Sequence, residues 1–332
     1  SNTREHTMYA NQQIEQLDRK KMASLQLERL QKQVRWAQEK SFFYNQKFEA
    51  KGVSYRDIQS LEDIRKLPFL KPRELFRLDS LDILTMPISS ILRFNVISLE
   101  QGEVKNLYTN GDVAHNVEMM TRCLVAEGIH SASVVALQGD LSDSRLLDIQ
   151  YALEMIGATV VPMGTDYRQW LRLMELISCD TLISTPQLIM QLIIQLQATG
   201  CNIGDYPLSR VICLNSQGTQ NAMQRHIADR THAEIFNFYD PAELGTAGML
   251  FQCKTHRGYH IQEDYFYPEV VEFHSDAAVT EPQQLGELVV TTLMAEAMPL
   301  IRFRTGQAVQ LEEGLCECGR TLRRVATPFS FA

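Results

Sequence analysis

The side chains best suited to chemistry are concentrated in one late stretch of the chain, residues 236–320. They lie in two short motifs, the first with Tyr239, Asp240 and Glu243 and the second with Arg304 and Gln307. Carboxylates hold divalent cations, and arginines hold phosphate or carboxylate groups. We therefore expect any reaction centre of this chain to lie here.

The same stretch holds a candidate metal site. Cys316 and Cys318 lie in a turn flanked by glycines, and Cys253 and His260 lie upstream in a segment that is also rich in turns. Three thiolates and one imidazole complete a tetrahedral zinc site, which we expect to be structural. The spacing leaves two alternatives open: His256 as the fourth ligand, or reduced cysteines that hold no metal.

The elements that position these residues follow an α/β pattern. Short apolar runs alternate with helical segments of about ten residues or more across residues 89–248, which predicts parallel βαβ units. Residues 1–88 read as a helical segment packed on the main domain, and residues 249–332 as a β-rich subdomain. A polar loop is expected over residues 100–106.

Composition narrows the functional classes. The 332 residues carry a formal net charge of -8, which argues against a general nucleic-acid surface. No apolar run reaches the roughly 18 residues that a membrane span needs. Of the seven cysteines, four stand singly in apolar or mixed segments, which is typical of reduced thiols in a cytoplasmic protein.

Several motifs, in order along most of the chain, resemble the phenylacetate-CoA ligases of the AMP-forming adenylate superfamily. The resemblance is to that family's large N-terminal domain. The motifs that carry it are Gly157-Ala158-Thr159-Val160-Val161-Pro162, Glu263-Asp264 with Tyr267-Pro268-Glu269, Gly286-Glu287-Leu288, and Arg302-Phe303-Arg304-Thr305.

The resemblance implies a reaction and its cofactors. Such enzymes activate a small carboxylic acid with ATP and Mg²⁺ to an acyl-adenylate and then transfer the acyl group to coenzyme A. By the same resemblance, Tyr239 stacks on adenine, Glu243 serves Mg²⁺, and Asp240 and Gln307 lie at the nucleotide. It also implies Glu243 and Arg304 as the catalytic candidates. Some relatives hold a metal with the Cys/His set, and a homodimer is plausible.

Three departures from the family pattern suggest weakened or lost catalysis. The segment that matches the phosphate-binding loop, residues 97–105, has a single glycine and carries Glu100 and Glu103, where like charge opposes a bound triphosphate. Gln307 replaces the aspartate that binds both ribose hydroxyls. The small C-terminal domain with the adenylation lysine is expected to be absent.

Two functional classes remain open from the sequence. The first is an AMP-forming ligase domain with an eroded nucleotide site. The second is a non-catalytic descendant of the fold that binds an acyl or aromatic ligand or a partner protein. Affinity for ATP·Mg²⁺ separates the two, because an enzyme requires it and a scaffold does not.

Overall fold

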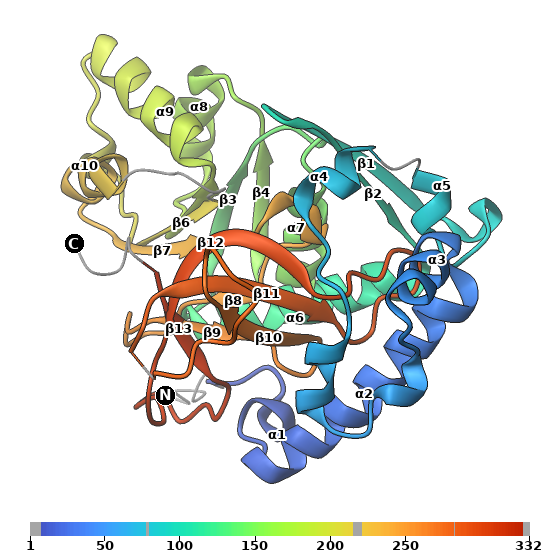
Figure 1. The fold of residues 1–332 in the computed structure, drawn as a ribbon. Coiled ribbons are helices and arrows are strands. Elements are labelled where there is room, and N and C mark those ends of the chain that lie inside the picture. Colours follow the sequence, from blue (N-terminus) through green and yellow to red (C-terminus); the bar gives the residue numbers. More distant parts are fainter. Residues whose placement is uncertain (1–7, 78–79, 215–220, 282, 328–332) are drawn as a thin grey trace.

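The computed structural model describes residues 8–77, 80–214, 221–281 and 283–327, and it begins with helices (Figure 1). Short α1 (Gln12–Glu15) precedes α2 (Arg19–Lys40) and α3 (Phe42–Lys51). The Asp18 carboxylate accepts from the first backbone N–H groups of α2, and Ser41 separates α2 from α3. The expected N-terminal helical segment is confirmed as a packed helical pair.

Short helices connect this pair to the first strands. They are η1 (Tyr55–Asp57), η2 (Leu61–Lys66), α4 (Pro72–Arg77), α5 (Ser80–Ile83) and η3 (Ile88–Ser90). Pro72 begins α4, where its missing N–H costs no helical hydrogen bond. Along the chain, α4 lies between the N-terminal helices and the strand pair that follows.

That strand pair is an antiparallel hairpin of β1 (Arg93–Leu99) and β2 (Gly102–Tyr108). The prediction of a polar loop over residues 100–106 is therefore wrong. The charged side chains of Glu103 and Lys105 alternate with the buried Val104, so polar residues line one face of a strand. Only Glu100 and Gln101 separate the two strands.

A five-stranded parallel sheet forms the middle of the chain and confirms the predicted βαβ units. Its order is β4-β3-β5-β6-β7, and every adjacent pair is parallel. Its strands are β3 (Val134–Gln138), β4 (Thr159–Met163), β5 (Thr181–Ser184), β6 (Arg210–Leu214) and β7 (Glu234–Phe238).

Helices cover both faces of this sheet, as Figure 1 shows. They are α6 (Asn110–Ala126) and α7 (Ser144–Ile156) on one face, and α8 (Tyr167–Leu176), α9 (Pro186–Ala198) and α10 (Asn221–Thr231) on the other. Leu182 packs with the second group and its neighbour Ile183 with the first. The alternation follows from the two-residue period of a strand.

The last quarter of the described chain forms a six-stranded antiparallel sheet, as expected for a β-rich portion. Its order is β10-β11-β12-β13-β9-β8. The strands are β8 (Leu250–Phe251), β9 (Tyr259–Ile261), β10 (Phe266–Val271), β11 (Gly286–Thr292), β12 (Phe303–Leu311) and β13 (Arg324–Ala326). The two- and three-residue strands were not predicted, because so few residues carry no periodic signal.

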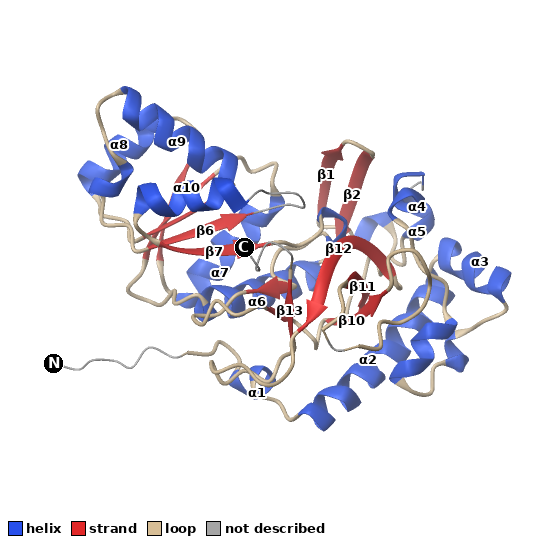
Figure 2. Cartoon of the chain, turned by 60° about the vertical axis from the view of Figure 1, so that its left-hand side comes forward, coloured by secondary structure: helices blue, strands red, loops and turns tan. Residues whose placement is uncertain are grey.

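One hydrophobic core joins this sheet to the N-terminal helices. Val34 of α2 and Phe48 of α3 pack in the same buried cluster as Leu288 and Phe303 of the sheet. The hydroxyl of Tyr44 also donates to the carbonyl oxygen of Pro299 at 2.7 Å. The three sheets and the helices around them can be followed in Figure 2.

None of the described helices is both long and apolar enough to cross a bilayer.

Candidate nucleotide and metal sites

The first site motif begins where β7 ends, at the carboxyl edge of the parallel sheet. Ligands of α/β proteins bind at this edge, because the loops after the strands meet there. Tyr239 and Asp240 follow β7 directly, and Glu243 lies in the short helix η5 (Ala242–Leu244). These three residues therefore lie together at one edge of the sheet.

Asp240 is buried and its carboxylate is already bonded to the backbone. Its two oxygens accept from the N–H groups of Gly248 at 2.7 Å and Leu250 at 3.0 Å. Burial raises the pKa of this carboxyl to about 6, although the two N–H groups oppose the shift. In this arrangement Asp240 shapes the loop after β7, and its role toward a nucleotide stays a prediction.

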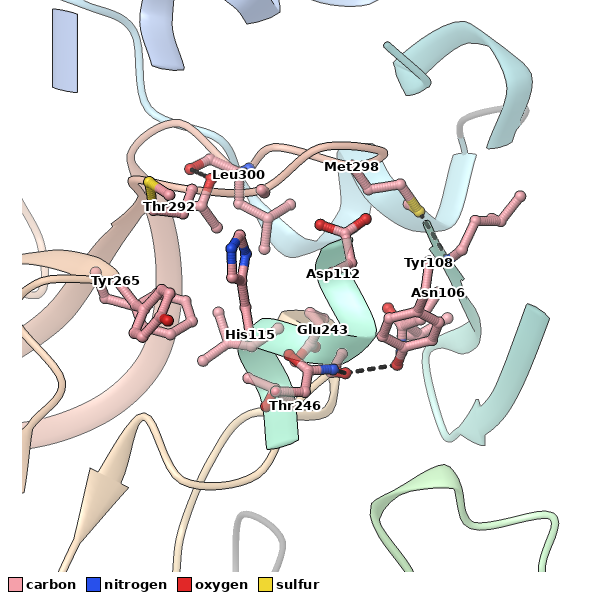
Figure 3. Close-up of a pocket in the computed structure, with 18 of the residues that line it drawn as sticks. Asn106, Tyr108, Asp112, His115, Glu243, Thr246, Tyr265, Thr292, Met298 and Leu300 are labelled. Carbon is pink, nitrogen blue, oxygen red and sulfur yellow. Dashed lines mark hydrogen bonds between the residues drawn. The ribbon is translucent and has the colours of Figure 1, made fainter. Parts of the chain in front are cut away.

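Glu243 lines a cavity between α6, β2 and the loops of the antiparallel sheet. In Figure 3, Asp112 and His115 extend from α6 into the same cavity. The Asp112 carboxylate is already hydrogen-bonded within the protein, because it accepts from the backbone N–H groups of Glu296 and Ala297. Burial raises the pKa of Glu243. Glu243 makes no hydrogen bond or ion pair to another described residue, so its carboxylate is free to hold a cation.

Tyr239 and Gln307 contact each other. The side-chain nitrogen of Gln307 donates to the carbonyl oxygen of Tyr239, and the phenol of Tyr239 accepts from Gln224. The Tyr239 ring lies edge-on to Tyr259 with 5.2 Å between centroids and is 4% exposed. The structure thus brings together two predicted nucleotide-binding residues, with the tyrosine packed into the protein.

Arg304 lies in a different cavity from Glu243. Its guanidinium pairs with Glu287 at 2.9 Å, bonds the carbonyl oxygen of Glu272 at 2.9 Å, and lies 4.8 Å from the Phe69 ring centroid. The cavity that Arg304 lines shares no lining residue with the one that holds Glu243. The structure therefore does not assemble the two catalytic candidates into one site, and the catalytic role of Arg304 stays a prediction.

The four predicted metal ligands converge. The ligand atoms of Cys253, His260, Cys316 and Cys318 are all buried and lie within 4.8 Å of one another. Cys253 Sγ lies 3.6 Å from Cys316 Sγ, and Cys318 Sγ lies 3.4 Å from His260 Nε2. Zn–S bonds of about 2.3 Å in a tetrahedron place neighbouring sulfurs about 3.8 Å apart, so the set fits zinc closely.

Two of the three thiols have a lowered pKa, which fits a metal, whereas the hydrogen bond with Cys253 raises the pKa of Cys318. The Nδ1–H of His260 donates to the carbonyl oxygen of Leu322 at 3.0 Å, which leaves Nε2 as the ligand atom. Hydrogen bonding with Cys318 lowers the pKa of Cys253 to about 7. For Cys316, burial opposes deprotonation, but hydrogen bonding with His260 brings the pKa to about 7. Thiolates are the form that binds zinc.

The alternative ligand His256 is placed elsewhere. Its Nε2 lies 2.8 Å from a carboxylate oxygen of Glu234, and its ring stacks on Phe236 at 4.5 Å. It lies outside the cluster of four ligand atoms. Among the described residues, His260 is therefore the histidine that completes the set.

No model of a known protein family matches the chain, but relatives are found along most of it. The phenylacetate-coenzyme A ligase of Escherichia coli is 30% identical over 319 residues, which cover 92% of this chain and 70% of that enzyme. The chain belongs to the phenylacetate-coenzyme A ligase family. The enzyme of the same name from Thermus thermophilus is 30% identical over 323 residues, with 93% and 70% coverage.

The fold agrees with this family. A crystal structure of 2-hydroxyisobutyryl-CoA ligase in an open conformation, in complex with 2-HIB-AMP and CoA, matches with a TM-score of 0.87 at 20% identity. The match covers 97% of this chain and 72% of that one. A thioesterification-state structure of the same enzyme gives a TM-score of 0.85. The α/β fold is that of the adenylate-forming ligases.

The β1–β2 hairpin differs from the phosphate-binding loop that the phenylacetate-coenzyme A ligase pattern leads us to expect. The segment expected to match the phosphate-binding loop is the end of β1, a two-residue turn and the start of β2. Glu100 and Glu103 are both exposed there. Backbone N–H groups paired in a ladder do not form an anion-binding cradle, which needs several unpaired N–H groups converging on one point.

Sequence reasoning missed the residues of α6 that face Glu243. His115 lies three residues after Asp112, a spacing that places both on one helix face. Its ring lies 5.2 Å from the Tyr265 ring across the cavity. The helical spacing was a usable signal, but nothing in the sequence indicated that this face points toward the loop after β7.

Proposed function

We propose that this chain is the large domain of an AMP-forming acid–thiol ligase with a strongly weakened adenylation step. Its substrates would be a small carboxylic acid, ATP with Mg²⁺, and coenzyme A. The observation that carries the proposal is the β1–β2 hairpin in place of a phosphate loop, within a chain that otherwise matches the family at 30% identity. The names of its relatives support acyl-CoA ligation as the parent activity.

Glu243 is the residue through which the proposed site would still hold Mg²⁺. It offers a free carboxylate in a partly enclosed cavity beside the carboxyl edge of the sheet. Burial favours its neutral form in the absence of a partner. A divalent cation would compensate that cost, which fits a role in holding the Mg²⁺ of ATP.

The β1–β2 hairpin is the reason for proposing that binding of the ATP triphosphate is weakened. ATP carries most of its charge on the triphosphate, and the hairpin presents Glu100 and Glu103 in place of a cradle of N–H groups. An acyl-adenylate carries one phosphate and depends far less on that loop. We therefore expect the chain to bind ATP more weakly than it binds an acyl-adenylate.

The test compares ATP·Mg²⁺ with an acyl-sulfamoyl-adenosine, a stable analogue of the adenylate, by calorimetry on the same protein. We expect the analogue to bind at least about tenfold more tightly, with the acyl group chosen from a panel of aryl and short aliphatic acids. Glu100→Gln/Glu103→Gln should improve ATP binding and leave the analogue unchanged. Failure of every analogue to bind would contradict the ligase proposal.

One observation favours the non-catalytic alternative. Gln307 bonds the backbone of Tyr239, so the ribose position is occupied by an internal contact. A descendant of the fold that binds an acyl or aromatic ligand, or a partner protein, needs no ribose clamp. This alternative predicts binding of free carboxylic acids without any adenylate analogue.

We also propose a structural Zn²⁺ on Cys253, His260, Cys316 and Cys318. The four buried ligand atoms and the single free imidazole nitrogen support it. A four-protein-ligand site is closed and leaves no position for a substrate. Thiolate ligation also suits a reducing compartment, in agreement with a cytoplasmic location.

A further inference from the structure

The outer strand of the β1–β2 hairpin has a free edge. Figure 1 shows the hairpin as a small sheet of its own, and among the described strands β1 pairs with β2 alone. The backbone groups on the other side of β1 make no hydrogen bond to the backbone of another described segment. Such a row of N–H and C=O groups is a template for pairing with a strand of another chain.

Three other sheet edges carry features that oppose such pairing. Proline lacks the N–H that a ladder needs, and two edge strands contain one, Pro162 in β4 and Pro268 in β10. Strand β8, at a third edge, has only two residues. Strand β1 has seven residues and contains neither proline nor lysine. Its edge is therefore open to a further strand.

Apolar side chains of β1 face solvent beside this edge. Phe94 is 59% exposed and Val96 is 45% exposed, and Leu92, just before the strand, is 64% exposed. Because they alternate along the chain, all three lie on one face of the hairpin. No other described strand exposes a large apolar side chain. Contact with a second apolar surface would remove this face from water, which favours association.

The spacing of these side chains fits a second copy of the same strand. In an antiparallel pair with a two-fold axis at Asn95, Phe94 of each copy lies opposite Val96 of the other. Aromatic and β-branched side chains in opposite positions stabilise a sheet. An axis at Val96 would instead place Phe94 opposite the hydroxyl of Ser98. The strand is therefore complementary to itself about Asn95.

Charge does not oppose this arrangement, although the chain carries a formal net charge of -8. Arg93 is the charged residue of β1, and its guanidinium pairs with Asp148 of α7 at 2.7 Å. The acidic turn of the hairpin lies away from the axis. In the pair about Asn95, the two copies of Glu100 are separated by roughly 33 Å along the strands, which is several Debye lengths.

We infer that two copies of this chain associate through β1, whose strands pair antiparallel about a two-fold axis at Asn95. The two hairpins then form one sheet in the order β2-β1-β1-β2 across the dimer. One strand pair buries less surface than a permanent dimer does, so we expect monomer and dimer to exchange with a dissociation constant of about 10–100 μM. The inference does not rest on the proposed ligase function.

Sedimentation velocity between about 1 and about 300 μM protein measures the association. Phe94→Glu/Val96→Glu places like charges opposite each other across the axis and should weaken association at least about tenfold. Phe94→Lys/Val96→Glu places opposite charges there and should associate more tightly than the first variant. Leu176→Glu/Ile194→Glu, which alters exposed side chains of α8 and α9, is the matched control and should behave as wild type.

A cysteine at the axis tests the register. The Cα atoms of the two Asn95 residues would lie about 4.5–5.5 Å apart, which is within the range of a disulfide. Asn95→Cys should therefore form a covalent dimer under mild oxidation. Ser98→Cys is the control in the same strand, because its two copies would lie roughly 20 Å apart and cannot be bridged.

Three results would overturn the inference. A wild-type protein that stays monomeric up to about 300 μM would exclude a second copy as the occupant and leave the edge to a peptide of another protein. A dimer that Phe94→Glu/Val96→Glu does not weaken would place the interface elsewhere. Equal cross-linking of Ser98→Cys and Asn95→Cys would contradict the axis at Asn95.

Discussion

Gln307 occupies the position where family resemblance implies an aspartate, and the structure shows what the amide does there. Its nitrogen bonds the carbonyl oxygen of Tyr239, while its oxygen Oε1 is buried without a partner in the described residues. A carboxylate could not donate to that carbonyl. The residue therefore stabilises the loop after β7 at the expense of a ribose contact.

We expect Gln307→Asp to strengthen ATP·Mg²⁺ binding and to lower stability. The new carboxylate offers charge-assisted bonds to the ribose hydroxyls, worth about 1.5–3 kcal/mol, while the lost bond to Tyr239 costs about 1 kcal/mol. Calorimetry and urea unfolding measure the two effects. Gln307→Ala is the control, since it loses the internal bond and adds no carboxylate. Equal ATP affinity in all three proteins would contradict this account of position 307.

Asp240 gives a pH-dependent prediction. Its folded pKa of about 6 lies above the ordinary value, so the native state binds more protons than the unfolded chain between about pH 4 and pH 6. Its contribution to stability is present below pH 4 and is lost as pH rises to 6. Asp240→Asn, which stays neutral, should gain roughly 2–3 kcal/mol relative to wild type between pH 4 and pH 7.

Urea unfolding at the two pH values measures this difference. Asp57→Asn is a suitable control, because its carboxylate caps a short helix near the surface, where it accepts from the backbone of Ser54. A gap between Asp240→Asn and wild type that does not change with pH would contradict the burial of a charged Asp240.

At the scale of elements, the cysteine turn and β9 depend on one another. Cys253 lies between β8 and β9, His260 is in β9, and Cys316 and Cys318 precede β13. These strands are only two or three residues long, so few ladder hydrogen bonds fix their register. A metal that joins their connecting loops would hold one edge of the antiparallel sheet in register.

We predict one zinc ion per chain by elemental analysis, and a lower melting temperature for Cys318→Ser. Loss of a structural ligand should cost several kcal/mol, or roughly 5–10 °C for a chain of this size. Cys201→Ser, which alters a half-buried cysteine outside the cluster, is the matched control. A metal-free native protein, or equal melting of both variants, would leave the zinc proposal without support.

Elements with a long periodic pattern were predicted well from the sequence. The five parallel strands and their helices are where the alternation placed them, because each is bounded by its own turn residues. The β1–β2 hairpin was missed at Gly102–Tyr108, since Glu103, Lys105 and Asn106 read as polar loop residues. Only the pairing with β1 shows that their neighbours Val104 and Leu107 are buried.

At the scale of the whole molecule, ion pairs join the N-terminal helices to the region of the antiparallel sheet. Arg320 in the cysteine loop pairs with Glu15 of α1 at 2.9 Å, and both are buried. Arg19 at the start of α2 pairs with Glu263 at 2.5 Å. Such contacts, between residues 305 and 244 positions apart, cannot be read from sequence spacing, although the acidic Glu263-Asp264 motif was noted for its resemblance.

Arg320→Ala should destabilise the protein by about 3–5 kcal/mol, because it leaves the Glu15 carboxylate buried without its cation. Glu15→Ala/Arg320→Ala should be more stable than Arg320→Ala alone, since it removes the stranded charge. Urea unfolding of the single and double variants measures the coupling. Additive losses from the two single substitutions would show that the pair does not couple the ends.

The family and the fold were predicted from the sequence, but the contacts that the candidate site residues make were not. The resemblance suggested Tyr239, Asp240, Glu243 and Gln307 as residues of the nucleotide site, and these roles stay predictions. The sequence could not show that the Asp240 carboxylate accepts hydrogen bonds from backbone N–H groups or that Gln307 bonds Tyr239. Such contacts depend on how the two sheets meet.

The most direct measurement is calorimetric titration of ATP·Mg²⁺ into the wild-type protein and Glu243→Ala. The account predicts weak binding, with a dissociation constant of about 1 mM or more, that requires Mg²⁺ and is lost in the variant. Micromolar binding would contradict the weakened phosphate site. No binding up to about 10 mM would contradict the ligase proposal and favour a binding module on an inherited fold.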